Sequence, residues 1–202
     1  MISRPGRRQS KNHFHAVLTL IAQLPLDLAR TLLTYRPTLR RMTDPGKLQD
    51  LVSPALEWAL TQEAFILKYG TPLRPAQIED ARRVGVRDID RVRVLVVDRI
   101  PPPDDGKLAE AARHAQIITE ASRVVTVGHG IIVRADSWQD RELLVHALVH
   151  VAQCERSGGL ETFVAEYLTD RTTCADFSVG SLEDEARQLA REFCAGTLAA
   201  AR

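Results

Sequence analysis

Residues 142–154, ELLVHALVHVAQC, decide the fold, because this stretch is apolar on almost every side and has two histidines at its centre. Such a run predicts a buried helix. His146 and His150 are four residues apart, so a helix places both side chains on one face, about one turn apart. Two imidazoles placed in this way can bind one metal ion, whereas two buried histidines without partners would each be costly. The spacing favours a metal site over the alternative, a pair of histidines that hydrogen-bond to other core groups.

The chain after this stretch contains two further predicted helices. Gly158 and Gly159 are expected to end the first helix, because glycine readily adopts the backbone conformation found at helix C-termini. A second helix is expected over residues 160–168, an irregular loop over residues 171–180, and a third helix from Ser181.

The first turn of that third helix carries two glutamates, Glu183 and Glu185. Ser181 and Asp184 have the spacing of a capping box. A first-turn carboxylate has an ordinary explanation, since it interacts favourably with the helix dipole by about 0.3–1 kcal/mol. Beside a helix with paired histidines it is also a candidate third metal ligand, which would leave one coordination position open.

The residues before the histidine helix alternate between helical and strand-like patterns. Ser137 and Asp140 have capping-box spacing and indicate where the histidine helix begins. β-branched runs predict strands over residues 91–98 and 124–134, the second interrupted or bent around Gly128 and Gly130. Apolar residues at helical spacing predict helices over residues 13–34, 46–68, 75–85 and 107–122. The sequence therefore predicts an α+β fold in which a small sheet packs on the histidine helix, preceded by N-terminal helices.

Composition and cysteine content narrow the class of protein. The chain has 202 residues, of which 45% are hydrophobic and 26% charged, as in ordinary folded proteins. These proportions exclude disordered, collagen-like and coiled-coil chains. The three cysteines form no CxxC pair, so they suggest neither a disulfide framework nor a cysteine-based zinc site, and they favour a reducing cytoplasm.

The net charge of +1 conceals a basic N-terminus, because residues 1–41 contain eight basic residues and one acidic residue. A secretory signal matches residues 16–26 only in part, since Gln23 and Pro25 interrupt the apolar run and no cleavage site follows. An arm that contacts a membrane surface or nucleic acid is also less favoured, because no nucleic-acid motif accompanies the arginines. We therefore expect a basic extension over residues 1–40, helical from about residue 13, and a domain over residues 41–202.

The motif H-A-L-V-H at residues 146–150, followed by E-D-E-A at residues 183–186, resembles the active-site core of zincin metallopeptidases. The likeness is to the glutamate-ligand kind, the gluzincins, and in particular to small bacterial zincin-like domains. It covers roughly residues 124–195. In that family an HExxH helix supplies two histidines and a later helix with an E-x-x-A-type motif supplies the third ligand.

This resemblance implies a zincin-like fold with Zn²⁺ bound by His146, His150 and Glu183, and Glu185 as the second choice for the third ligand. Arg187 stands where many relatives have an acidic residue that supports the site. The resemblance also implies that a peptide or protein substrate binds along an edge strand, here residues 130–134.

The chain departs from the family pattern at Ala147, which stands where HExxH has the glutamate that acts as general base. Alanine cannot transfer a proton, and losing a general acid–base lowers a rate by about 10²–10⁴. Glu142 lies one turn before His146, but we interpret it as an outer partner of the ligands or as a charge at the helix start rather than as a replacement base. Zinc binding does not require the missing glutamate.

The sequence therefore supports two classes of function. The first is a zinc-dependent peptidase-like hydrolase domain that is inactive or nearly so, because Ala147 is either a natural degeneration or a deliberate Glu→Ala substitution. The second is a non-catalytic zinc-binding or structural protein. Arg134, His129 and Tyr167 are weaker candidates for substrate contacts.

Overall fold

The structure, a computed structural model, describes residues 45–173 and 181–200 of the chain. They belong to a unit that spans Pro45–Arg202. The predicted basic extension over residues 1–40, with its helix from about residue 13, lies outside the described residues.

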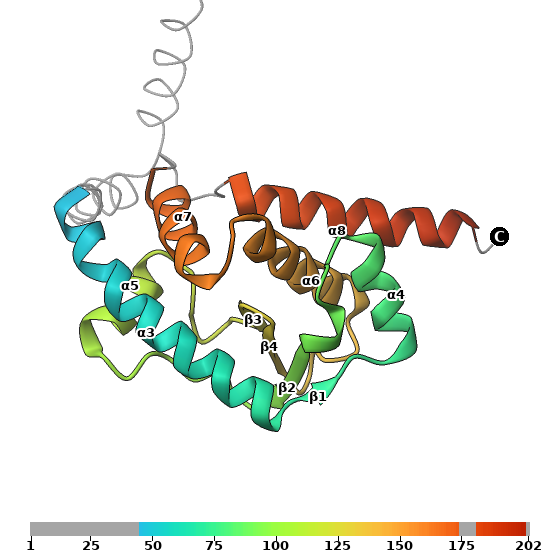
Figure 1. Cartoon of the computed structure of the whole chain (residues 1–202), viewed down its shortest axis with the longest axis horizontal. Helices are drawn as coiled ribbons and strands as arrows, with labels where there is room; N and C mark the ends of the chain where they lie inside the picture. The colour runs from blue at the N-terminus through green and yellow to red at the C-terminus, as the bar shows by residue number, and fades with distance from the viewer. Residues whose placement is uncertain (1–44, 174–180, 201–202) are drawn as a thin grey trace, which may run out of the picture. The chain divides into compact units, whose positions relative to one another are not determined.

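The described residues form six α-helices, one short 3-10 helix and four strands (Figure 1). The domain is α+β, as its sequence predicts. In chain order the elements are α3 (Pro45–Tyr69), β1 (Thr71–Pro72), α4 (Pro75–Arg83), η1 (Ile89–Arg91), β2 (Arg93–Val97), α5 (Gly106–His114), β3 (Val124–Val127), β4 (Gly130–Arg134), α6 (Arg141–Arg156), α7 (Leu160–Thr173) and α8 (Ser181–Ala200).

The four strands form one mixed sheet in the order β1-β2-β4-β3. β4 pairs with β2 in parallel and with β3 antiparallel, so it lies inside the sheet. The prediction that residues 130–134 form an edge strand is wrong, because neighbours on both sides use the backbone groups that an added peptide would need. Residues 124–134 are two strands rather than one bent strand, since the backbone reverses at Gly128, where φ is +57°.

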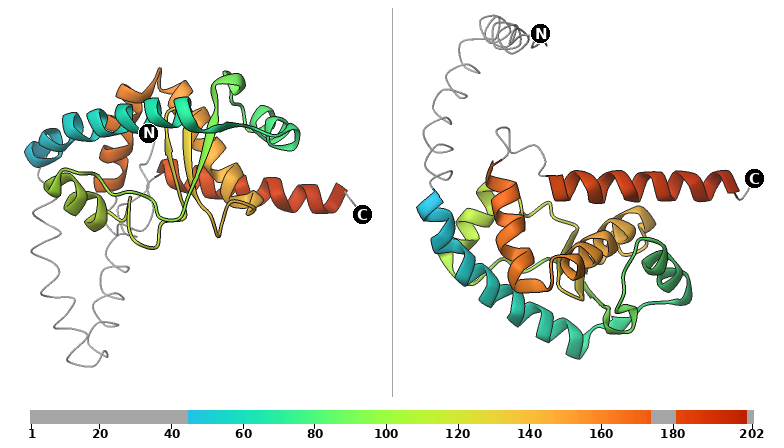
Figure 2. Two further views of the ribbon diagram at one scale, coloured as in Figure 1. Left: turned by 90° about the horizontal axis from the view of Figure 1, so that it is seen from below. Right: turned by 45° about the horizontal axis from the view of Figure 1, so that its top comes forward.

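Successive residues of β4 point to opposite faces of the sheet and into two apolar clusters. Ile132 belongs to the cluster that includes Ile66 of α3, and Ile131 belongs to the cluster that includes Leu148 of α6. Figures 1 and 2 show the strands between α3 and α6, with α8 beyond α6. The apolar character of α6 follows from this position, because it packs on the sheet with one side and on α8 with another.

Several helix ends differ from the predictions. α5 ends at His114 instead of near residue 122, because Gln116 takes a left-handed conformation with φ of 53°. α7 extends to Thr173 instead of ending at residue 168. The rest of the predicted loop, residues 174–180, lies outside the described part of the chain.

Two predicted capping boxes are replaced by other contacts. Asp140 rather than Ser137 is the N-cap of α6, and its carboxylate accepts a hydrogen bond from the Leu143 amide. At the start of α8, the carboxylate of Asp170 in α7 accepts hydrogen bonds from the amides of Ser181 and Leu182. The first turn of α8 is therefore attached to the end of α7.

Helix α6 is attached to its surroundings at both ends. At its N-terminus, the guanidinium of Arg141 donates two hydrogen bonds, of 2.9 and 2.7 Å, to the buried carboxylate of Asp80 in α4. At its C-terminus, the carboxylate of Glu155 accepts hydrogen bonds from the amides of Arg87, at 2.7 Å, and Asp88, at 2.9 Å. None of the described helices is long and apolar enough to cross a membrane.

Candidate metal centre

Two histidines of α6 and one glutamate of α8 meet at a single point, where their side chains face one another. His146 Nε2 lies 3.3 Å from Glu183 Oε1, and His150 Nε2 lies 3.3 Å from Glu183 Oε2. The two Nε2 atoms are 3.1 Å apart. The structure therefore brings together the three residues that the sequence motifs single out as metal ligands.

The spacing of these atoms fits a metal ion bound between them. Four ligand atoms arranged tetrahedrally about 2.0–2.1 Å from a zinc ion lie about 3.3–3.4 Å from one another. The two histidine nitrogens are 3.1 Å apart, and each lies 3.3 Å from a different oxygen of Glu183. Three protein ligands leave a fourth position open. Two imidazole nitrogens and one carboxylate are donor types that Zn²⁺ takes, and one ligand atom from each residue lies within 4.8 Å of the others, close enough to hold a metal ion.

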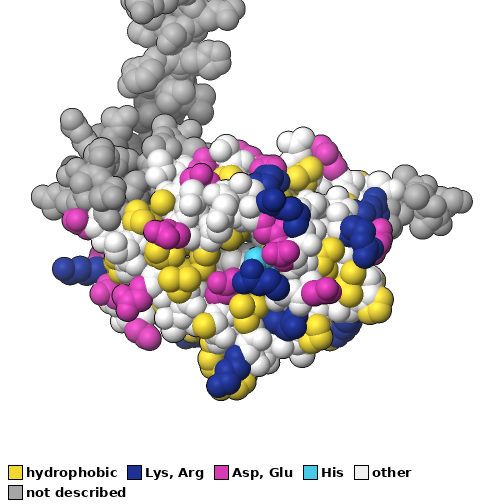
Figure 3. Space-filling model, in the orientation of Figure 1, with side chains coloured by type: hydrophobic (Ala, Val, Ile, Leu, Met, Phe, Trp, Pro, Cys, Tyr) yellow, Lys and Arg dark blue, Asp and Glu magenta, His cyan; other side chains and the backbone are white. Residues whose placement is uncertain are grey.

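The site is half-buried, and the pKa of its carboxylate, Glu183, is strongly lowered. The side chains of His146 and Glu183 are 16% and 17% exposed, so the site reaches the protein surface. Figure 3 shows a histidine side chain at the surface, bordered by basic and acidic side chains. Burial alone would raise the pKa of Glu183, but its interactions with the imidazoles of His146 and His150 in their protonated, positively charged form outweigh it and hold the pKa far below its usual value. Glu183 is therefore a carboxylate at neutral pH.

Tyr167 of α7 adds a hydroxyl to the site. Its Oη donates a hydrogen bond of 3.2 Å to Glu183 Oε2, and its ring meets the His150 ring edge-on. Burial, followed by the nearby Glu183 carboxylate, raises the pKa of the Tyr167 hydroxyl. Tyr167 therefore stays protonated and holds one oxygen of Glu183. Of the weaker sequence candidates, it is the one that contacts the predicted ligands.

Gln153 contacts the predicted ligand His150, and Glu185 in turn contacts Gln153. Gln153, three residues after His150, is 1% exposed, and its Oε1 lies 2.7 Å from His150 Nδ1. Its amide nitrogen donates to Glu185 Oε2 at 2.9 Å, and Arg156 also contacts that carboxylate. Glu185 therefore has other partners, and Glu183 is the glutamate that faces the histidines. Sequence reasoning overlooked Gln153, although a glutamine inside an apolar helix and one turn after His150 is a detectable signal.

Ala147 lies on the side of α6 that faces the sheet. Its side chain is fully buried and belongs to the apolar cluster with Ile131 and Leu148, while its carbonyl oxygen accepts a hydrogen bond from Thr126 of β3. Glu142 instead lies 3.9 Å from Arg191 of α8. No contact between Glu142 and the three predicted ligands is seen among the described residues.

Two other candidates from the sequence lie outside this site. Arg134 forms an ion pair with Asp136, at 2.7 Å. His129 lies in a second cluster, where ligand atoms of Asp88, His129 and Glu155 also come close enough to hold a metal ion. Both oxygens of Glu155 already accept backbone hydrogen bonds there, so we interpret that cluster as structural.

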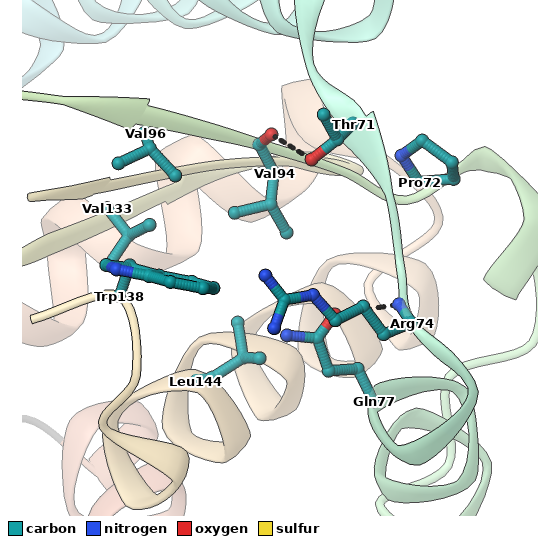
Figure 4. Close-up of a pocket in the computed structure, with 9 residues that line it drawn as sticks. All are labelled: Thr71, Pro72, Arg74, Gln77, Val94, Val96, Val133, Trp138 and Leu144. Carbon is teal, nitrogen blue, oxygen red and sulfur yellow. Dashed lines mark hydrogen bonds between the residues drawn. The ribbon is translucent and has the colours of Figure 1, made fainter. Parts of the chain in front are cut away.

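A separate cavity of about 260 Å³ lies between β1, β2 and the start of α6 (Figure 4). Arg74 and Gln77 point into it, and the Arg74 guanidinium lies 4.4 Å from the centre of the Trp138 ring. The remaining lining residues are mainly apolar, and none of the three predicted metal ligands is among them. The cavity has no acid–base pair, so it is not a candidate catalytic site.

In comparisons with known proteins, no family model matches the chain, and neither a curated protein nor a solved structure matches it. The interpretation of the site therefore rests on its residues and geometry.

Proposed function

We propose that this chain is a zinc-binding domain of the zincin-like, gluzincin type, related to peptidases but inactive or nearly so as a peptidase. The observation that supports this most directly is the convergence of two imidazole nitrogens and a carboxylate from separate helices, 3.1–3.3 Å apart. Two histidines and one glutamate are the ligand set of known catalytic zinc sites that keep one coordination position open.

The donor types favour zinc over other common ions. Calcium and magnesium prefer sites made mainly of oxygen atoms, whereas imidazole with carboxylate suits zinc and related transition metals. Bound in this site, zinc would supply Lewis acidity. His146, His150 and Glu183 would hold it, and Tyr167 and Gln153 would keep the ligands in place.

The absence of a base accounts for the proposed lack of hydrolysis. Ala147 has no titratable group, and the neighbouring carboxylates Glu142 and Glu185 contact Arg191 and Arg156 respectively. Among the described residues, no other carboxylate comes as near to the two histidines as Glu183 does. A peptide bound here would therefore meet ligands but no proton acceptor suited to hydrolysis.

Metal analysis of the full chain tests the proposal. Protein purified without chelator should contain about one zinc per chain, and His150→Ala should abolish tight binding because it removes one of three ligands. His114→Ala is the matched control, since His114 lies in α5, away from the predicted ligands, and pairs with Glu110. Stoichiometric zinc in His150→Ala, measured by elemental analysis, would contradict the proposal.

A non-catalytic structural role is the second candidate, and the position of the ligands favours it. Glu183 is in α8 and both histidines are in α6, so a bound ion would join the two helices. We keep a reducing cytoplasm as the expected compartment, because Cys154 and Cys194 are free thiols.

A further inference from the structure

Gln153 is the most deeply buried polar side chain near the metal site. Its side chain makes three hydrogen bonds: Oε1 with His150 Nδ1 at 2.7 Å, and Nε2 with the Leu182 carbonyl oxygen at 2.8 Å and with Glu185 Oε2 at 2.9 Å. An amide buried to 99% in an otherwise apolar helix is costly unless these bonds are formed.

The two acceptors on α8 fix the orientation of the Gln153 amide. The Leu182 carbonyl and the Glu185 carboxylate can only accept hydrogen bonds, so the NH₂ group of Gln153 must face them. The amide oxygen then faces His150 Nδ1. Since that oxygen can only accept, Nδ1 of His150 must carry the hydrogen.

This hydrogen determines which nitrogen of His150 is free to bind a metal. In a neutral imidazole one nitrogen carries hydrogen and the other carries a lone pair. With Nδ1 protonated, Nε2 presents its lone pair, and Nε2 is the atom that lies 3.3 Å from Glu183 and 3.1 Å from His146. Gln153 therefore selects the tautomer that a ligand requires.

The amide nitrogen of Gln153 binds to the first turn of α8, the helix that carries Glu183. Leu182 and Glu185 stand immediately before and two residues after Glu183 in the first turn of α8. Arg156 holds Glu185 as well, with contacts of 2.7 and 2.9 Å. Gln153 thus attaches this turn to α6 at the level of His150.

We propose that Gln153 is the positioning residue of the metal site: it sets the tautomer of His150 and docks the turn of α8 that carries Glu183. This inference rests on the proposed metal binding, and it assigns to one side chain the alignment of two ligands from different helices.

Two variants separate the two roles. Gln153→Met has similar length but no hydrogen bonds, so it removes both. Gln153→Glu keeps an acceptor for His150 Nδ1 but directs a carboxylate at the Leu182 carbonyl and at Glu185, so it disrupts only the contact with α8. Gln188→Met is the matched control, because Gln188 lies on the exposed face of α8 and donates a hydrogen bond to Glu192 rather than to a predicted ligand.

Two measurements on the full chain decide the question. Nitrogen-15 NMR of the metal-free protein at alkaline pH, with His150 assigned through His150→Ala, should show hydrogen on Nδ1 in the parent and in Gln153→Glu. Competition with a chelator of known affinity should show zinc binding weakened about 10- to 100-fold in Gln153→Met. Gln153→Glu should also bind more weakly, and Gln188→Met should bind as the parent does.

The outcomes distinguish this inference from the proposed function. A parent that does not bind zinc overturns both. A parent that binds zinc while Gln153→Met binds equally well overturns only the positioning role. Hydrogen on Nε2 of His150 in the metal-free parent also overturns it, and this readout remains decisive if Gln153→Met fails to fold.

Discussion

At the scale of single residues, the chemistry proposed for the site depends most on Ala147, whose side chain is a methyl group. Ala147 follows His146 directly in α6, and its side chain is fully buried against apolar residues on the sheet side of the helix. A side chain at this position lies next to a predicted ligand, yet it contributes nothing that can accept a proton. His146 and His150 lie beside Glu183, which also accepts a hydrogen bond from Tyr167.

Replacing Ala147 tests whether only the base is missing. We expect Ala147→Glu, loaded with zinc, to hydrolyse a generic fluorogenic peptide about 10²–10⁴ times faster than the parent, because it restores a general acid–base. Ala147→Gln has almost the same size and no base, so its rate should stay at the parental level. Both variants should melt at a lower temperature than the parent, since they bury a polar group in an apolar cluster.

Rates are therefore compared per amount of folded, zinc-loaded protein. Equal rates in Ala147→Glu and Ala147→Gln would contradict the proposed relation to peptidases and would leave only the proposed metal binding.

At the scale of elements, the turn between β3 and β4 is joined to two helices through His129. His129 Nε2 lies 3.0 Å from Glu155 of α6, and its Nδ1 lies 3.6 Å from Glu63 of α3. The backbone amide of His129 also donates to Glu63. The positive φ of Gly128, +57°, favours glycine there, and a Cβ at this position would displace the Glu63 carboxylate. The turn thus connects the helices on either side of the sheet.

The ionisation of this cluster makes its contribution to stability depend on pH. The Glu63 hydrogen bond, helped by Glu155, raises the pKa of His129 against the opposing effects of burial and Arg91. Burial alone would raise the pKa of Glu63, but its interactions with His129 and Arg91 lower it. Burial alone would also raise the pKa of Glu155, but hydrogen bonds from the Arg87 and Asp88 amides and the interaction with His129 lower it. The raised pKa of His129 stabilises the fold below about pH 6.5, and this contribution is lost as the pH rises through the raised pKa.

The carboxylates act in the opposite direction. Their lowered pKa values stabilise the fold above about pH 4.5, and this contribution is lost as the pH falls through the lowered pKa values. We therefore expect His129→Gln to lower the melting temperature most between about pH 4.5 and 6.5 and less at pH 8. Thermal unfolding of parent and variant across this range measures the difference. His114→Gln serves as control, and a His129→Gln effect that grows towards pH 8 would refute the assignment.

Sequence patterns predicted most elements but not their contacts. The apolar run of α6, the β-branched runs of β2 and β4, and Pro75 at the first turn of α4 each act locally, so their elements form where expected. The position of residues 130–134 inside the sheet was missed, because strand order depends on pairing between segments distant in the sequence.

At the scale of the whole domain, the predicted metal would join α6 to α8 and stabilise the fold by binding only the native state. Free zinc at 100 times its dissociation constant adds about 2.7 kcal/mol to the free energy of unfolding. We expect zinc to raise the melting temperature of the parent and a chelator to lower it, with neither affecting Glu183→Gln as strongly. An equal response of Glu183→Gln and parent in differential scanning calorimetry would count against Glu183 as a ligand.

The composition of the candidate site was predictable in part, for a physical reason. His146 and His150 share one helix face and Glu183 follows in a recognisable helix start, so local pattern and resemblance suffice to propose them. Tyr167 and Gln153 reach the site through contacts between α6, α7 and α8. Those contacts depend on packing, which a motif does not encode.

The attachments of α6, to Asp80 at one end and to the amides of Arg87 and Asp88 at the other, have a counterpart in α8. The first turn of α8, which carries Glu183, is held to α7 by Asp170 and to α6 by Gln153. Both helices that carry the predicted ligands are therefore fixed by contacts outside the ligand set, and we expect the addition of zinc to leave the spacing between α6 and α8 unchanged.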